Sequence, residues 1–219
     1  MHWSEQTIHM IDFEGDTTTG IVEFGIVTVF QGNITGTISR LCRAQKAIPK
    51  ESSLVHGIYT EDVLSSAPFA EEWQRFVQLR RKGLFAAHHA RYENKLLKST
   101  WSHPPYCPNF VEDGKSLAEW GPWIDTHPLY IHLIPKCSSY KLSALVQHLG
   151  LQDELDRIAI NRCPAGRNRY HCALYDALAA ALLLLKVDDL QANASLRWLA
   201  LYSRRNPMAH AQGELSLSY

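Results

Sequence analysis

The chain has 219 residues, of which 46% are hydrophobic and 20% are charged, and its 22 basic and 22 acidic residues leave no formal net charge. This length suits one sizeable α/β core better than two independent domains, and a neutral protein is not expected to coat long stretches of duplex DNA. No apolar run approaches the roughly 20 residues of a membrane span, and the first residues lack the pattern of a secretory signal, so no membrane association is expected.

The first part of the chain predicts an antiparallel meander of three strands. Residues 8–13 are mostly apolar and predict a short buried strand with acidic residues at its end. After a turn-rich stretch at residues 15–20, the β-branched and aromatic residues 21–30 predict a second strand. Residues 31–33 (Gln-Gly-Asn) fit a hairpin turn, and residues 34–42 continue as a third strand.

Helical patterns then alternate with shorter strands. Thr60 or Ser66 would cap short helices, and residues 69–79 carry apolar side chains on one helical face. Residues 84–87 resemble a buried strand that leads into an amphipathic stretch near residues 91–101. The remaining predicted elements are a loop-rich insertion at about residues 100–123, a fifth strand at 123–126 that runs into a helix, and helices at 140–149, 170–186 and 194–202.

This order of elements predicts an α/β fold in which a mixed sheet is covered by helices on both faces. Residues 1–190 are expected to form one domain, and residues 191–219 a C-terminal helix with a polar tail. Five cysteines at irregular spacing favour reduced thiols over a disulfide framework, and therefore a cytoplasmic protein.

Asp12 and Glu14 stand at positions i and i+2 at the end of the first predicted strand, so both side chains leave the same face. Two unpaired carboxylates held together repel each other, and one of them tends to take up a proton. A hard divalent cation such as Mg²⁺ or Mn²⁺ removes that repulsion. Acidic pairs at strand ends are also common without any function, so this pair alone is weak support for a metal site.

Two further stretches carry candidate chemistry. In AHHARYE, residues 87–93, Glu93 falls in the first turn of a predicted helix, where a carboxylate often only complements the helix dipole. In YHCALYDA, residues 170–177, His171 and Asp176 are separated by about 140° around a helix of 3.6 residues per turn. They can therefore meet only if His171 lies on the loop that enters the helix. Taken singly, both stretches are more often structural.

Together these stretches resemble the DnaQ-like, DEDDh group of 3′–5′ exonucleases, over roughly residues 8–186. AHHARYE is similar to the group's A-H-N-A-x-F-D motif, and HCALYDA is similar to its H-x-A-L-x-D-A motif. Further matching pieces are Asp12, Glu14, Gly20, Glu23 and Gly25 of the first motif, then Ile48-Pro49, His56-Gly57-Ile58, Asp62-Val63, Pro68-Phe69, Trp123-Ile124-Asp125-Thr126 and Tyr140-Lys141-Leu142.

The resemblance implies a ribonuclease H-like fold with a mixed five-stranded sheet, an antiparallel meander of strands 1–3 followed by parallel strands. It implies that two divalent ions, Mg²⁺ or Mn²⁺, are held by Asp12, Glu14, Glu93 and Asp176, and that His171 is the general base. In a two-metal site one ion activates water and the other stabilises the leaving 3′-oxygen. A histidine can accept the water's proton near neutral pH. Attack on the last phosphodiester would release a nucleoside 5′-monophosphate from a nucleic-acid 3′ end.

By the same analogy, Phe13, Gly15, His56 and His88 are expected to bind the terminal nucleotide. An aromatic ring can stack on a base, although core packing explains Phe13 equally well. The sequence departs from the family pattern at two points. Glu93 stands where Asp is usual and reaches one methylene further, which predicts an altered metal preference. Residues 15–20 (GDTTTG) replace the usual Thr-Thr-Gly turn, whose backbone normally contacts the substrate.

DNA 3′ ends, single-stranded or frayed, are favoured as the substrate. An exoribonuclease that trims short RNA is the alternative within enzymes, because the contacts that read a 2′-hydroxyl are not identifiable in the sequence. A proofreading or accessory nucleic-acid-binding subunit without chemistry is a second alternative, although the complete set of four acids with His171 favours catalysis. Nothing in the sequence indicates a protein partner or a homodimer.

Overall fold

Five strands form the central sheet, in the order β3-β2-β1-β4-β7. β1 (Ile8–Asp16), β2 (Gly20–Phe30) and β3 (Asn33–Leu41) are antiparallel neighbours, whereas β4 (Leu84–Ala87) and β7 (Ile124–Asp125) extend the sheet in parallel with β1. This confirms the predicted mixed sheet and its meander. The structure is a computed structural model that describes residues 1–204, so most of the predicted polar tail lies outside the described residues.

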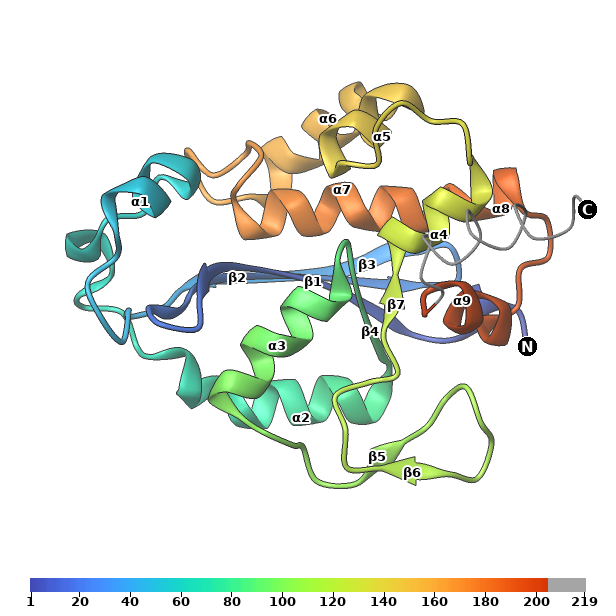
Figure 1. The fold of residues 1–219 in the computed structure, drawn as a ribbon, viewed down its shortest axis with the longest axis horizontal. Helices are drawn as coiled ribbons and strands as arrows, with labels where there is room; N and C mark the ends of the chain where they lie inside the picture. The colour runs from blue at the N-terminus through green and yellow to red at the C-terminus, as the bar shows by residue number, and fades with distance from the viewer. Residues whose placement is uncertain (205–219) are drawn as a thin grey trace, which may run out of the picture.

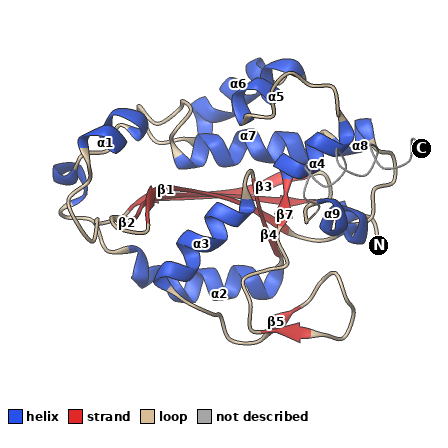
Figure 2. Cartoon of the chain, in the orientation of Figure 1, coloured by secondary structure: helices blue, strands red, loops and turns tan. Residues whose placement is uncertain are grey.

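Helices cover both faces of the sheet (Figures 1 and 2). One face carries α7 (Ala173–Leu185), with α5 (Leu142–His148) and α6 (Gln152–Arg162) packed outside it, and the other face carries α2 (Trp73–Lys82) and α3 (Ala90–Thr100). The other described elements are η1 (Trp3–Glu5), α1 (Lys50–His56), η2 (Thr60–Val63), η3 (Phe69–Glu72), β5 (Cys107–Pro108), β6 (Ser116–Leu117), α4 (Thr126–Leu133), α8 (Val187–Leu190) and α9 (Leu196–Tyr202). None of the helices within residues 1–204 combines the length and the apolar character that a bilayer crossing needs.

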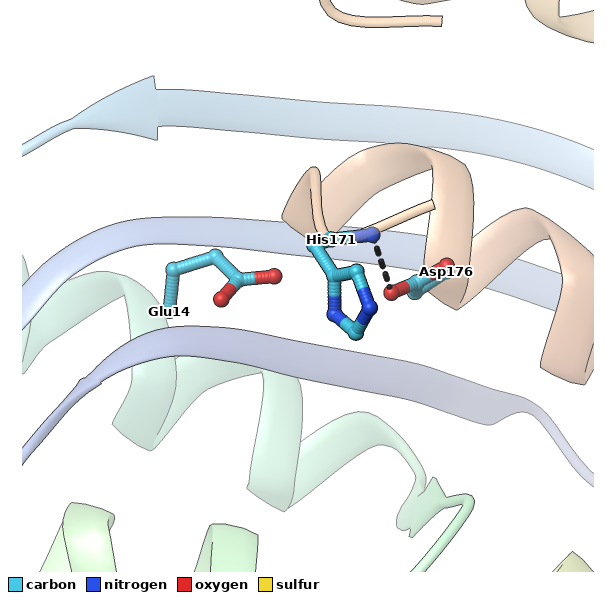
Figure 3. Close-up of side chains that lie close together, drawn as sticks. All are labelled: Glu14, His171 and Asp176. Atoms are coloured by element: carbon cyan, nitrogen blue, oxygen red, sulfur yellow. Dashed lines mark hydrogen bonds between the residues drawn. The ribbon is translucent and has the colours of Figure 1, made fainter. Parts of the chain in front are cut away.

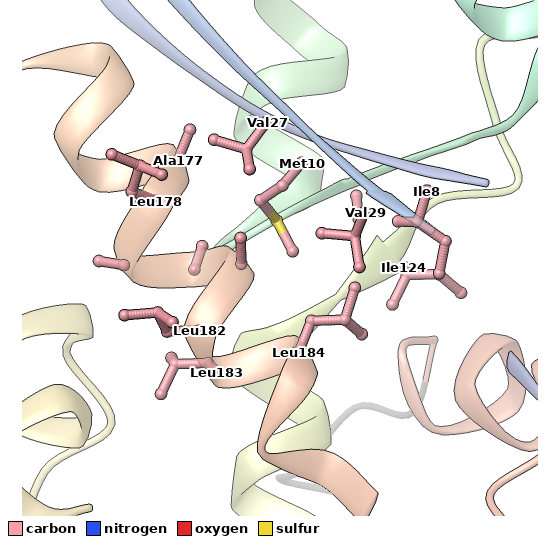
Figure 4. Packing of buried hydrophobic residues seen from close by; sticks show 14 of the residues in the cluster. Ile8, Met10, Val27, Val29, Ile124, Ala177, Leu178, Leu182, Leu183 and Leu184 are labelled. Carbon is pink, nitrogen blue, oxygen red and sulfur yellow. The ribbon is translucent and has the colours of Figure 1, made fainter. Parts of the chain in front are cut away.

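The alternation of side chains along β1 decides which residues can reach the site. Ile8 and Met10 pack under α7 in one core (Figure 4). Ile11 and Phe13 belong to a second, aromatic core that includes residues of α2. Asp12 and Glu14 continue the row of Ile8 and Met10, so they emerge on the α7 side of the sheet. Every residue of α7 except Leu185 is buried, which is expected of a helix that is apolar on all sides.

The predicted insertion is more ordered than the sequence suggested. β5 and β6 form a two-stranded hairpin within it, and Trp120 is fully buried. The fully buried guanidinium of Arg80 donates hydrogen bonds to the carbonyls of Trp120 (3.0 Å), Pro108 (2.8 Å) and Gly121 (2.6 Å). These bonds attach the insertion to α2. The predicted domain boundary near residue 190 stays a prediction, and α9 contacts α4 and β7.

Candidate active site

Gly25 on β2 allows α7 to lie directly against the sheet. A Cβ atom at this position would overlap the carbonyl group of Ala173, so no larger residue fits without displacing the helix. Gly25 is also the register partner of Asp12 on β1. The first turn of α7 is therefore held beside the acidic end of β1, which brings Asp176 next to Asp12.

Four carboxylates from three elements gather at this point: Asp12 and Glu14 on β1, Glu93 in the first turn of α3, and Asp176 in the first turn of α7. Burial raises the pKa of Glu14 to about 8 and that of Asp176 to about 7, and nearby carboxylates add to both shifts. Burial and then the neighbouring carboxylates also raise the pKa of Asp12 and of Glu93 well above their usual range. One oxygen of Glu93 and one of Asp176 are buried without a hydrogen-bond partner. Such a donor set suits hard divalent cations.

A fifth acid, Glu23, differs because its charge is already matched. Arg167 donates to both of its carboxylate oxygens, through Nε to Oε1 at 3.0 Å and through Nη2 to Oε2, and the backbone N–H of Ala173 donates to Oε2 at 3.0 Å. The Glu23 carboxylate thus accepts an N–H group at the N-terminus of α7 and complements the helix dipole. Arg167 also donates to the carbonyl of His56 at 2.7 Å. The arginine therefore links β2, α1 and the loop before α7, and leaves Glu23 unsuited to hold a cation.

His171 lies on the loop that enters α7, because the helix begins at Ala173 rather than at the predicted residue 170. This meets the condition under which His171 and Asp176 can converge. Its backbone is left-handed (φ 61°), and its N–H donates to Asp176 Oδ2 at 3.0 Å. Ligand atoms of Glu14, His171 and Asp176 all lie within 4.8 Å of one another, and Figure 3 shows the imidazole between the two carboxylates.

Two of the four residues expected at the terminal nucleotide lie at the end of β1. The ring of Phe13 faces away from the acids and packs edge-on against Phe69 at 5.5 Å, so the structure favours the core-packing interpretation. Its backbone N–H instead hydrogen-bonds the Glu93 carboxylate. Gly15 has a φ of 124°, and its carbonyl accepts a hydrogen bond from the Tyr92 hydroxyl at 3.0 Å. That bond joins the altered turn to α3.

The other two expected substrate residues are buried histidines. His56 accepts the backbone N–H of Ile58 on Nδ1 at 3.1 Å, and its Nε2 is buried without a partner. His88 Nε2 lies 3.0 Å from the carbonyl of Tyr140, which can only accept, so Nε2 carries the proton and Nδ1 accepts from Thr126 at 2.9 Å. Burial lowers the pKa of His88 to about 3, helped by neighbouring histidines. His88 is therefore neutral, and both of its ring nitrogens are occupied.

The sequence did not reveal the role of Asp125, which was only part of a matching motif. Its carboxylate accepts the N–H groups of His89 (3.0 Å), Ala90 (2.9 Å) and His127 (3.0 Å), and so caps α3 and α4 together. An aspartate directly before a helix is a recognisable N-cap for α4. The bonds to α3 span more than thirty residues of sequence, so no local pattern could indicate them. Asp125 fixes the turn of α3 that carries Glu93.

Known proteins resemble this chain in sequence. The sequence pattern of the family RNase_T, described as exonuclease, matches residues 10–184. A DNA polymerase III of the PolC type from Thermotoga petrophila is 27% identical over 191 residues, which is 84% of this chain and only 12% of the polymerase.

Two solved structures share the fold. Exonuclease X in complex with 5′ overhanging duplex DNA has a TM-score of 0.65 and 23% identity, over 90% of this chain and 99% of that chain. A 3′-exonuclease that recognises the 3′ end of a histone mRNA stem-loop has a TM-score of 0.64 and 16% identity, over 88% of this chain and 85% of that chain. At these identities the likeness concerns the fold alone.

Proposed function

The chain belongs to the RNase_T family of exonucleases, and on that premise we propose that it is a metal-dependent 3′–5′ exonuclease that removes nucleoside 5′-monophosphates from single-stranded or frayed DNA 3′ ends. The observation that carries this proposal is the group of four carboxylates that burial and mutual repulsion hold with raised pKa values. The fold does not need this group, since holding each ionised carboxylate there costs free energy until a cation neutralises its charge.

Asp12, Glu14, Glu93 and Asp176 would hold two divalent ions, Mg²⁺ or Mn²⁺. Bound there, such ions supply Lewis-acid stabilisation of charge at a phosphodiester and a more acidic water. The unpartnered oxygens of Glu93 and Asp176 are the atoms that most need this charge. Glu23 is not assigned as a ligand, because Arg167 already occupies both of its oxygens.

His171 would accept the proton of the attacking water. Its side chain is exposed, while its backbone is fixed by the bond to Asp176, so the imidazole is positioned without being enclosed. An imidazole nitrogen held in this position can act as a general base toward a bound water. The short distances among Glu14, His171 and Asp176 also allow His171 to be a metal ligand, which makes metal binding by a His171 variant the deciding measurement.

DNA is favoured as the substrate because the related polymerase and exonuclease X act on or bind DNA, as their names state. The likeness to an exonuclease that recognises an mRNA stem-loop supports RNA as the alternative. Both polymers present a 3′ end to the same four acids, so the choice rests on contacts outside the metal site.

The test is digestion of 5′-labelled single-stranded DNA, of a duplex and of RNA with the same sequence, in Mg²⁺, Mn²⁺ or EDTA. We expect a ladder that shortens from the 3′ end, requires metal, and is stronger on single-stranded DNA. Asp12→Ala should abolish it. Cleavage in EDTA, full activity of Asp12→Ala, or internal cuts would contradict the proposal, and a ladder on RNA alone would transfer it to an exoribonuclease.

A further inference from the structure

Three adjoining hollows extend from the four acids along α3, and we call them together the α3 groove. The first has a volume of about 490 Å³ and is lined by residues that include Asp12, His171 and Asp176. It shares the walls His88 and His89 with a second hollow of about 550 Å³. The second shares Arg91 and Asp125 with a third of about 150 Å³. The shared walls make one path that begins at the candidate catalytic centre.

The outer part of this path is lined by cations. Arg91 and Lys95 stand at i and i+4 on α3, so they are neighbours on one face of the helix, and both line the second hollow. Both are exposed, and neither forms an ion pair within residues 1–204. Arg204 lines the third hollow and Lys141 lines the first.

The acids of the second hollow do not cancel this positive charge. Asp125 accepts three backbone N–H groups, which compensate its carboxylate. Glu93 is nearly buried and belongs to the four-acid group. Two aromatic side chains complete the wall. They are Tyr92, which is 47% exposed, and His89, whose ring centroid lies 4.0 Å from the ring centroid of His127. Free cations interleaved with exposed rings are the combination that binds single-stranded nucleic acid.

We propose that the α3 groove binds the single DNA strand upstream of the cleaved bond, with Arg91 and Lys95 contacting its backbone phosphates and His89 at the crossing between the first two hollows. This inference rests on the proposed exonuclease function and adds the path of the substrate to it. The contacts are made to phosphates, so the groove binds any sequence. Neighbours at i and i+4 offer two cations to consecutive phosphates of one strand.

The test uses the double variant Arg91→Gln/Lys95→Gln and, as a charge-matched control, Arg157→Gln/Lys115→Gln. Arg157 and Lys115 are exposed and line none of the three hollows. Two substrates are compared over a range of salt concentrations. One is a labelled single-stranded oligonucleotide, and the other is the p-nitrophenyl ester of thymidine 5′-monophosphate, which has no upstream phosphate.

Each lost phosphate contact should make the slope of log(kcat/KM) against log(salt) shallower by about 0.7, so the double variant should lose about 1.4 of slope on the oligonucleotide. Between 50 and 200 mM salt this amounts to roughly a 7-fold smaller loss of activity than in the wild type. The ester should be hydrolysed at the wild-type rate, and the control pair should match the wild type on both substrates.

An unchanged slope overturns the inference, and so does an equal loss on the ester, because Arg91 and Lys95 would then act on the centre or on folding. If the wild type hydrolyses neither substrate, the proposed function fails instead. In that case the salt dependence of oligonucleotide affinity, measured by fluorescence anisotropy in EDTA, still tests whether the α3 groove binds the strand. A shallower slope in the double variant supports it, and equal slopes or no binding by the wild type refute it.

Discussion

Replacing Asp176 by asparagine should stabilise the metal-free protein while abolishing exonuclease activity. Asparagine keeps an oxygen that can accept the N–H of His171, the bond now made at 3.0 Å to Oδ2, so the local geometry survives. It removes the charge that burial opposes. Without a bound cation, the buried and ionised carboxylate of Asp176 costs free energy of folding. A neutral amide has no such cost.

The magnitude follows from the pKa. Burial raises the pKa of Asp176 from 3.8 to about 7, so the folded state holds this proton more tightly than the unfolded chain. Stability from this group is therefore complete below pH 4 and is lost as the pH rises toward 7. At about 1.4 kcal/mol per pKa unit, the ionised carboxylate costs at most about 4 kcal/mol at pH 8 and less than half of that at pH 5. The neighbouring acids share this electrostatic cost, so one substitution removes only part of it. We expect the free energy of unfolding to rise by about 2–4 kcal/mol.

Thermal unfolding followed by circular dichroism measures this directly. In EDTA at pH 8, Asp176→Asn should raise Tm by roughly 4–16 °C, and the gain should shrink at pH 5. Mg²⁺ should raise the Tm of the wild type far more than that of the variant. Asp113→Asn, at an exposed loop position, is the control and should change little. A variant that is less stable than the wild type at pH 8 in EDTA would refute the reasoning, since Asp176 would then be stabilised by partners inside the protein.

Three further substitutions separate the remaining roles. Arg167→Met leaves Glu23 buried without its partner and should cost about 3–5 kcal/mol in urea unfolding, whereas a loss below 1 kcal/mol would show that the pair is not needed. His171→Ala should lower kcat by about 100- to 10,000-fold while Mg²⁺ binding by calorimetry is kept, and lost binding would identify His171 as a ligand. Glu93→Asp shortens the reach of this carboxylate into the centre. It should reduce turnover in Mg²⁺ by up to about 100-fold and turnover in Mn²⁺ by less. Equal rates in both metals would exclude an altered metal preference.

The parts of the fold that were predictable from the sequence are those with regular patterns. The meander and α7 depend on runs of apolar residues, and these predictions are confirmed. α1 (Lys50–His56) and α6 (Gln152–Arg162) were missed because short or weakly amphipathic helices gain their stability from packing rather than from their own pattern. The hairpin of β5 and β6 was missed for a related reason. Its attachment depends on Arg80, whose carbonyl partners lie 28 to 41 residues away.

In the candidate site, local spacing identified which acids could converge, and long-range contacts decided what each one does. Glu23 and Glu14 are both acids of the first matched motif, yet the partner that neutralises Glu23 lies 144 residues away. The ring of Phe13 was ambiguous in the sequence, although strict alternation with Asp12 and Glu14 already places it on the opposite face of β1. Alternation was the more informative signal for this residue, and the analogy to a base-stacking ring was the weaker one.

A net charge of zero is compatible with binding a polyanion because the charges are separated in space. The four acids proposed to hold cations gather at one point, with Glu93 and Asp176 buried and Asp12 and Glu14 half-buried, and Glu23 is neutralised by Arg167. The cations Arg91, Lys95 and Arg204 line the α3 groove, and the first two form no ion pair within residues 1–204. The electrostatic attraction of such a protein for nucleic acid is short in range and limited to a few phosphates. It would hold the end of one strand weakly enough to advance after each cleavage, which suits an enzyme that shortens its substrate one nucleotide at a time.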